Sequence, residues 1–141
     1  MKEDVISILK ELEFSFEEED GLINFEYENE EFYILTEERY PFIQLRKNDM
    51  MTVRMDNLDE VLRLKNAINS ANDNCFVSIQ YKVLQNEVFA VGRANFLFES
   101  FVPNRKGLLK LMLSKFIEMK NYLKEEMLTQ QYAERPKTLI N

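Results

Sequence analysis

The stretch CFVSIQYKVLQNEVFAVGRANFLFE, residues 75–99, holds two runs of alternating apolar and polar residues around one turn signal. In the first run the odd positions from Cys75 to Val83 are apolar, and this period of two is typical of a β-strand. A turn at Gln85–Asn86 would place Val83 opposite Val88, so we predict a β-hairpin that forms the floor of the core. The side chains predicted on its core face are Cys75, Val77, Ile79, Tyr81, Val83, Val88, Ala90, Gly92, Ala94 and Phe96.

The small residues Ala90, Gly92 and Ala94 leave a shallow trough along the second strand, which would let a helix approach closely. A long amphipathic helix is predicted after Pro103, capped by Asn104 and about 24 residues long. We expect this helix to cover the hairpin. Its apolar stripe is Leu109, Met112, Leu113, Phe116, Met119, Leu123 and Met127.

The first part of the chain predicts an antiparallel meander of three strands. A turn at Asp20–Gly21 would pair Phe16 with Phe25, and a turn at Asn29–Glu30 would place Phe25 opposite Ile34. Both turns put aromatic side chains on one face and acidic side chains on the other.

The remaining segments complete an α+β fold with an antiparallel sheet, an N-terminal helix, a middle helix and a long C-terminal helix. They are a helix at 2–12, a strand at 42–46, a turn at Asn48–Asp49, a short strand at 50–55 and a helix at 57–71 capped by Asp56 or Asn57. No linker interrupts the chain, so we predict one domain over residues 1–130 and a frayed tail over 131–141.

Composition excludes several kinds of site. The chain of 141 residues has no histidine, one cysteine and three glycines, which removes Ser-His and Cys-His dyads, thiolate metal cages and glycine-rich phosphate loops. Cys75 is expected to be a buried, inert thiol. Without a long apolar run or a signal peptide, we expect a protein of the bacterial cytoplasm with no membrane association.

No residue pattern predicts catalysis, so we expect a non-enzymatic protein with no catalytic residues, no cofactor and no metal. Two alternatives stay open. The many carboxylates leave room for a carboxylate-only enzyme, although Glu17–Asp20 and Glu28–Glu31 lie at turns, where acids keep a sheet edge soluble. The stretch 92–98 faintly resembles an RNA-recognition strand, but a net charge of −7 opposes nucleic-acid binding, which we do not expect.

The second face of the predicted hairpin is mixed, with apolar residues around one arginine. A fully exposed face would not need these apolar residues, so either the 57–71 helix or another protein chain covers it. The candidate partner or dimer surface consists of Phe76, Phe89, Val91, Arg93 and Leu97.

Three segments resemble the YbjN-like family, whose fold is similar to that of type III secretion chaperones. They are GLINFEYENEEFYIL (21–35), LDEVLRLKNAINSANDNCFVSIQY (58–81) and VFAVGRANFLFE (88–99), and the likeness extends over about residues 2–128. The resemblance implies an α+β sandwich, a homodimer and a chaperone-like role in binding another polypeptide, by strand addition or by groove docking. It implies no catalytic residues.

The dimer leads to a first prediction. Size-exclusion chromatography with light scattering at micromolar concentration should give twice the mass of one chain. A strict monomer under these conditions would contradict the expected homodimer.

Overall fold

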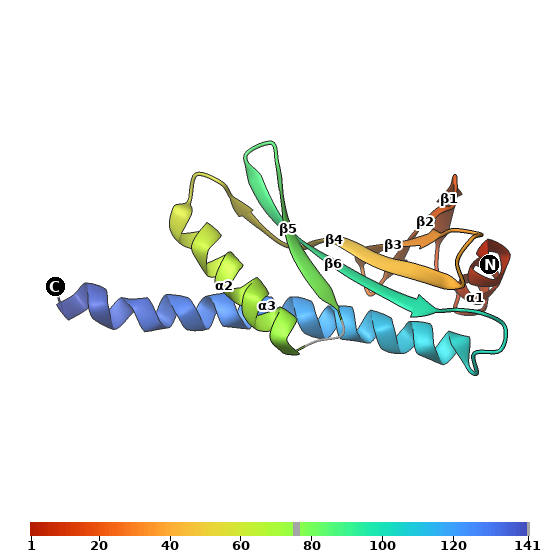
Figure 1. Cartoon of the computed structure of the whole chain (residues 1–141). Coiled ribbons are helices and arrows are strands. Elements are labelled where there is room, and N and C mark those ends of the chain that lie inside the picture. The colour runs from red at the N-terminus through yellow and green to blue at the C-terminus, as the bar shows by residue number, and fades with distance from the viewer. Residues whose placement is uncertain (75–76, 141) are drawn as a thin grey trace. The chain divides into compact units, whose positions relative to one another are not determined.

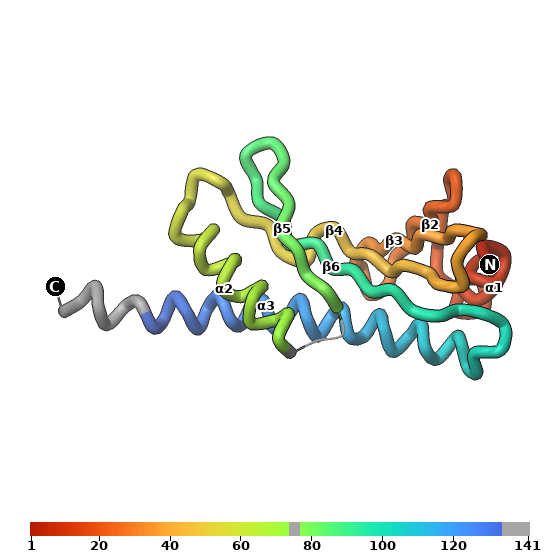
Figure 2. The backbone as a smooth tube through the Cα atoms, viewed as in Figure 1, coloured from red at the N-terminus to blue at the C-terminus, as the bar shows by residue number. Residues whose placement is uncertain are grey.

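A computed structural model describes the backbone of residues 1–74 and 77–140 and the side chains of residues 1–73 and 77–133. It has the predicted α+β architecture, with helices and strands in the predicted order (Figures 1 and 2). The six strands form one sheet in the order β1-β2-β3-β4-β6-β5. The elements are α1 (Lys2–Glu11), β1 (Phe16–Glu19), β2 (Leu22–Tyr27), β3 (Glu30–Thr36), β4 (Phe42–Arg54), α2 (Leu58–Asn74), β5 (Ser78–Leu84), β6 (Glu87–Leu97) and α3 (Arg105–Ile140).

The chain divides into two compact units, which are described separately below. Unit 1 combines Met1–Lys47 with Arg93–Ser114, and unit 2 combines Asn48–Gly92 with the chain from Lys115 onward. The unit boundaries fall within β4, β6 and α3. The predicted domain over residues 1–130 and tail over 131–141 stay predictions, although α3 is helical to Ile140 and therefore longer than the sequence indicated.

The meander of unit 1 is antiparallel, and its first turn is as predicted. Phe16 pairs with Phe25 around Asp20–Gly21. The second predicted register is wrong by two residues, because the turn lies at Glu28–Asn29, where both φ angles are positive (51° and 63°). Phe25 therefore pairs with Phe32 instead of Ile34. An even shift leaves every side chain on its predicted face, so the aromatic face survives the error.

Strand β4 corrects another prediction, because the turn expected at Asn48–Asp49 does not exist. The strand runs without interruption from Phe42 to Arg54. Both Asn48 and Asp49 are exposed, although they are neighbours along the strand. Two consecutive exposed residues break the alternation of period two, as a β-bulge does, and this change of phase explains why the sequence pattern resembled a turn.

The core of unit 1 lies on one face of the sheet, with α1 and the start of α3 against it (Figure 1). Arg105 of α3 binds both α1 and the segment after β6: it donates to Asp4 Oδ2 at 3.2 Å and to the carbonyl of Phe98 at 3.0 Å, and its guanidinium lies over the Phe98 ring. The buried side chains of this core are Val5, Ile8, Leu9, Ile23, Phe25, Phe32, Ile34, Ile43, Leu45, Ala94, Phe98, Leu109 and Leu113.

One charged side chain, Lys47, is fully buried among these apolar groups. It follows Ile43 and Leu45 on the inward positions of β4, where alternation directs its side chain into the core. Its Nζ lies 2.8 Å from Glu30 Oε2, donates to the carbonyl of Glu31 at 3.2 Å and lies 5.1 Å from the centre of the Phe32 ring. The ammonium is thus paired, as a buried charge must be.

We predict that Lys47→Ala lowers the free energy of unfolding by about 3 kcal/mol, since it removes packing and leaves Glu30 without its ammonium. Lys47→Met keeps the side-chain volume, and water can replace the ammonium at Glu30, whose side chain is 26% exposed. The methionine variant should therefore lose less than half as much unfolding free energy as the alanine variant. Urea unfolding of both variants checks this. Equal losses would contradict this prediction, because they would assign the whole loss to the ion pair that both variants lack.

Unit 2 packs α2 and the later part of α3 against its strands. Asn57 caps α2, because its Oδ1 accepts from the Glu60 amide at 3.3 Å. The helices are joined by a 2.5 Å hydrogen bond between Ser70 Oγ and Tyr122 Oη. Helix α2 extends past its predicted end at residue 71 to Asn74. Near this end, the side chain of Asn72 forms hydrogen bonds of 2.8 Å with both the amide and the carbonyl of Ile79.

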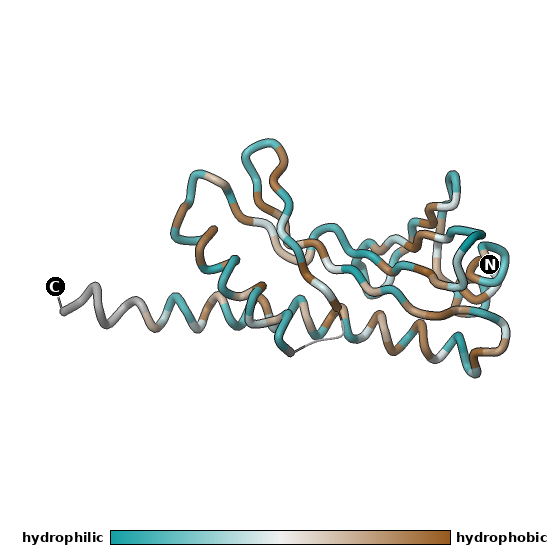
Figure 3. The backbone as a smooth tube through the Cα atoms, viewed as in Figure 1, coloured by the Kyte–Doolittle hydropathy of each residue, from teal (hydrophilic) through white to brown (hydrophobic). Residues whose placement is uncertain are grey.

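The predicted hairpin turn is confirmed, because Gln85 and Asn86 both have positive φ (49° and 66°), as a two-residue type I′ turn requires. The predicted burial holds for Val77, Ile79, Val88, Ala90 and Ala94, but not for the end of β5 that precedes the turn. Tyr81 and Val83 are 58% and 48% exposed, because the turn end of the hairpin extends away from α3 (Figure 1). Figure 3 shows the apolar positions along the strands and α3 in brown. Cys75, predicted on this strand, lies outside the described residues.

At the predicted trough, Phe116 of α3 packs against Gly92 of β6. A Cβ added at Gly92 would lie 3.1 Å from Phe116 Cε1 and 3.2 Å from Met50 Sδ. Phe116 is fully buried. Only a residue without a side chain permits this contact at full packing density.

Gly92→Val should therefore lower the free energy of unfolding by about 2 kcal/mol, because its methyl groups must displace the Phe116 ring. Gly92→Ala is the graded control and should cost under about 1 kcal/mol, since the thioether of Met50 can move. Denaturant titration measures both, and an unchanged midpoint for the valine variant would contradict the close contact.

Within the described residues, none of the helices has the length and apolar character that a membrane crossing requires.

Candidate functional site

The structure places four of the five residues of the predicted partner surface. Phe89 and Val91 belong to unit 2, and Arg93 and Leu97 to unit 1, all on β6. Val91 is only 5% exposed, because other residues of the same chain already cover it, and it is not available to a partner. Phe89, Arg93 and Leu97 are partly exposed, whereas Phe76 lies outside the described residues.

Arg93 and Leu97 contribute to the face of the unit 1 sheet that points away from the core, which we call the outer face. The strand registers assign its members, because partners across antiparallel strands share a face. Its other members are Glu17, Glu19, Leu22, Asn24, Glu26, Glu31, Tyr33, Leu35, Phe42, Gln44, Arg46 and Asn95.

Glu31 is the acidic centre of one part of the outer face. Its Oε1 accepts hydrogen bonds from Tyr33 Oη at 2.7 Å and from Asn24 Nδ2 at 2.9 Å. This carboxylate is therefore held by neutral donors from β2 and β3. Glu26 lies opposite Glu31 across the two strands, and both line a hollow of about 380 Å³ together with Glu17. Acids therefore gather on this part of the outer face, which is where a carboxylate-only enzyme would have to act.

The next part of the outer face is a chain of side-chain hydrogen bonds across β4 and β6. Arg46 Nη2 donates to Gln44 Oε1 at 3.0 Å, and Gln44 Nε2 donates to Asn95 Oδ1 at 3.1 Å. The amide of Phe98 also donates to the carbonyl of Pro41 at 2.9 Å. Both contacts fit one antiparallel register, which places Arg46 opposite Arg93.

Arg46 and Arg93 form a pair of like charges on this face. Burial lowers the pKa of Arg46, and the neighbouring positive charge of Arg93 lowers it further. The Nε atoms of both side chains are buried and have no hydrogen-bond acceptor among the described residues. Two adjacent guanidiniums with unused donors can bind an anion.

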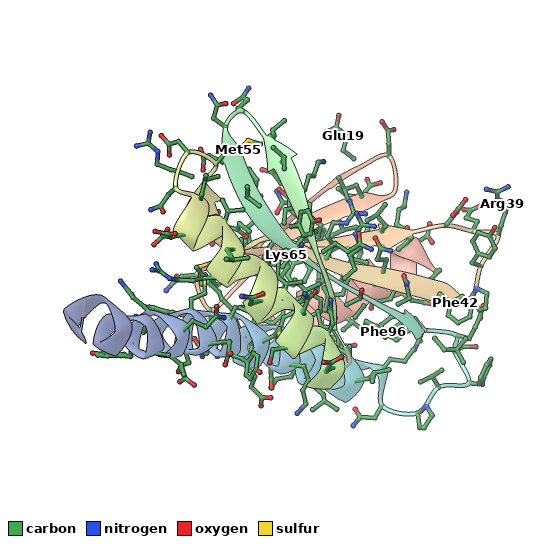
Figure 4. The ribbon with its side chains drawn as sticks, turned by 60° about the vertical axis from the view of Figure 1, so that its left-hand side comes forward. Glu19, Arg39, Phe42, Met55, Lys65 and Phe96 are labelled. Atoms are coloured by element: carbon green, nitrogen blue, oxygen red, sulfur yellow. The ribbon has the colours of Figure 1, made fainter. Side chains whose placement is uncertain are left out.

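A hollow of about 440 Å³ lies beside this hydrogen-bonded chain and shares Gln44 and Asn95 with it. Its walls carry exposed apolar side chains, among them Tyr40 and Phe42 at about half exposure. Figure 4 labels Phe42 at the start of β4 and Arg39 in the loop before it. The complete lining is Leu35, Glu37, Tyr40, Phe42, Ile43, Gln44 and Asn95. Such a hollow suits an apolar side chain flanked by a polar backbone.

Sequence reasoning identified Arg93 and Leu97 but missed Arg46, Gln44 and Phe42. The signal for them was the alternation Phe42-Gln44-Arg46 along one strand, opposite to Ile43 and Leu45. It could assign those residues to an outer face, but it could not pair β4 with β6. That pairing joins strands far apart in the sequence.

Unit 2 exposes apolar side chains of its own. Met55 is tied to the hairpin turn by a 2.8 Å bond from its amide to the carbonyl of Asn86. Other exposed side chains lie on β5 and on the first turns of α2. They are Leu58, Leu62, Tyr81, Val83 and Leu84.

No histidine, cysteine or acidic side chains are grouped so as to hold a metal ion in the part of the chain that the structure describes.

Comparison with known proteins supports the fold. No family model matches the sequence, and no curated protein matches it. The chain is structurally similar to YbjN from E. coli, a proposed transcription regulator, with a TM-score of 0.63 and 14% identity over 91% of this chain and 92% of that one. An uncharacterized protein from Methanothermobacter thermautotrophicus aligns with a TM-score of 0.61 and 11% identity over 92% of this chain and 99% of that chain. The chain therefore has a YbjN-like fold.

Proposed function

We propose that this protein is a non-enzymatic, chaperone-like interaction module that binds an extended segment of another polypeptide on the outer face of unit 1. One observation carries the proposal: an apolar hollow of about 440 Å³ adjoins a chain of hydrogen-bonded polar side chains on a sheet face. Apolar anchors beside oriented polar groups are what peptide-binding surfaces combine.

The composition and the chemistry of the outer face favour binding over catalysis. The chain has no histidine and one cysteine, so neither a Ser-His nor a Cys-His dyad can form. The carboxylate of Glu31 is occupied by Asn24 and Tyr33. We place the protein in the bacterial cytoplasm, which its single cysteine and acidic composition support.

A homodimer is part of the proposal. Unit 2 offers a second copy a surface of exposed apolar side chains, and the group around the hairpin turn includes Met55, Tyr81 and Leu84. Groups of exposed apolar side chains are typical of interaction surfaces. The mass from light scattering tests this part of the proposal.

Site-specific photo-crosslinking in the native cell tests polypeptide binding. We predict that p-benzoylphenylalanine in place of Tyr40, which lines the hollow, gives covalent adducts with another polypeptide on illumination. The same residue in place of Phe101, an exposed aromatic of unit 1 outside the hollow, is the matched control and should give none.

Phe42→Asp should abolish the adducts formed at position 40, because it places a charge in the apolar wall. Phe42 is 49% exposed, so this variant should fold. Identical adducts from positions 40 and 101, or none from position 40, would refute a polypeptide-binding hollow.

A further inference from the structure

Arg46 and Arg93 differ from three other arginines of the chain in how their charges are balanced. Arg39, Arg54 and Arg105 each form an ion pair with a carboxylate. Neither Arg46 nor Arg93 has a carboxylate within ion-pair distance among residues 1–73 and 77–133. This is unexpected in a chain with 25 acidic and 18 basic residues, where acids are in excess.

The two unbalanced charges lie opposite each other on neighbouring strands. The 3.1 Å bond from Gln44 to Asn95 and the 2.9 Å bond from Phe98 to Pro41 share the register that makes Arg46 and Arg93 a cross-strand pair. Side chains directly opposite have Cβ atoms about 5 Å apart, and like charges at this distance repel. The fold therefore holds two guanidiniums together at an electrostatic cost.

The donors of this pair are only partly used. Arg46 makes one hydrogen bond, to Gln44, and both Nε atoms are buried without an acceptor. The terminal nitrogens of Arg93 have no acceptor in the described structure and are not among its buried unpaired atoms, so they reach the surface. An anion placed there would receive charge-assisted hydrogen bonds and relieve the repulsion.

We propose that Arg46 and Arg93 together bind one carboxylate side chain, an aspartate or glutamate, of the polypeptide that the outer face receives. This inference rests on the proposed function and adds the chemistry that selects the partner. The pair recognises the acid, and the hollow at Phe42 receives an apolar side chain of the same segment.

The surroundings favour a single carboxylate over the phosphates of a nucleic acid. Glu31 lies on the outer face with the two arginines, and Glu37 lines the hollow that contains Phe42. A phosphodiester chain would bring several negative charges close to Glu31 and Glu37, whereas a polypeptide needs to present only one carboxylate to the arginines. The apolar wall of the hollow also offers nothing to a phosphate.

The spacing along β4 sets the partner's pattern. Phe42 and Arg46 are four residues apart on one face, which is about 13 Å at about 3.3 Å per residue. An extended segment lying along β4 would cover that distance in about four residues. We therefore expect an aromatic or aliphatic residue about four positions from an acidic one.

Selection from a displayed library of random 12-residue peptides, with the full chain as bait, tests this pattern. Enriched peptides should share an acidic residue about four positions from an apolar one. A labelled peptide from this set should bind about tenfold more weakly, by fluorescence anisotropy, when its acid is changed to the matching amide.

Arg46→Gln and Arg93→Gln should each remove that tenfold preference, and Arg54→Gln, which removes the same charge in unit 2, should keep it. Circular dichroism confirms that the variants fold. Peptides that bind without an acidic residue but lose binding in Phe42→Asp would overturn the carboxylate site and leave the proposed function standing.

Two further results would overturn the inference. One is the absence of any peptide enriched over an unrelated bait. The other is salt-dependent binding of single-stranded oligonucleotides that requires Arg46 and Arg93, since the pair would then serve phosphates.

Discussion

Alternation along β4 determines both the core and the outer face of unit 1. Ile43, Leu45 and Lys47 point inward and are fully buried. Because successive side chains of a strand point to opposite faces, the same backbone turns Gln44 and Arg46 outward. A shift of one residue would bury Arg46 and expose Leu45, so the packing of the core holds the candidate binding residues in place.

The charged side chains on the two faces of β4 differ in whether an opposite charge lies beside them. On the inward face, the ammonium of Lys47 is matched by Glu30, by a carbonyl and by an aromatic ring. On the outward face, Arg46 meets the like charge of Arg93, and its pKa is lowered by burial and by that charge. The Lys47 charge is thus compensated within the fold, whereas the charges of Arg46 and Arg93 have no carboxylate beside them in the described structure.

The sequence predicted what depends on neighbouring residues. The caps of Asn57 and Asn104 and the turn at Gln85–Asn86 were predictable, because each uses residues within a few positions. The turn at Glu28–Asn29 was misplaced by one residue, which changes the register by two, and alternation cannot distinguish registers that differ by an even number. Alternation also suggested where Arg93 points, but the opposed Arg46 requires the β4–β6 pairing, which no local pattern encodes.

Two hydrogen bonds join Asn72 and Ile79: Asn72 Nδ2 donates to the Ile79 carbonyl, and the Ile79 amide donates to Asn72 Oδ1. They occupy the free side of β5, which is an edge strand of the sheet. A strand that approached this edge would find both backbone groups of Ile79 already engaged. The opposite edge strand, β1, is four residues long and carries three consecutive glutamates, which repel a neighbour. Both margins of the sheet thus carry features that oppose templated growth into fibrils.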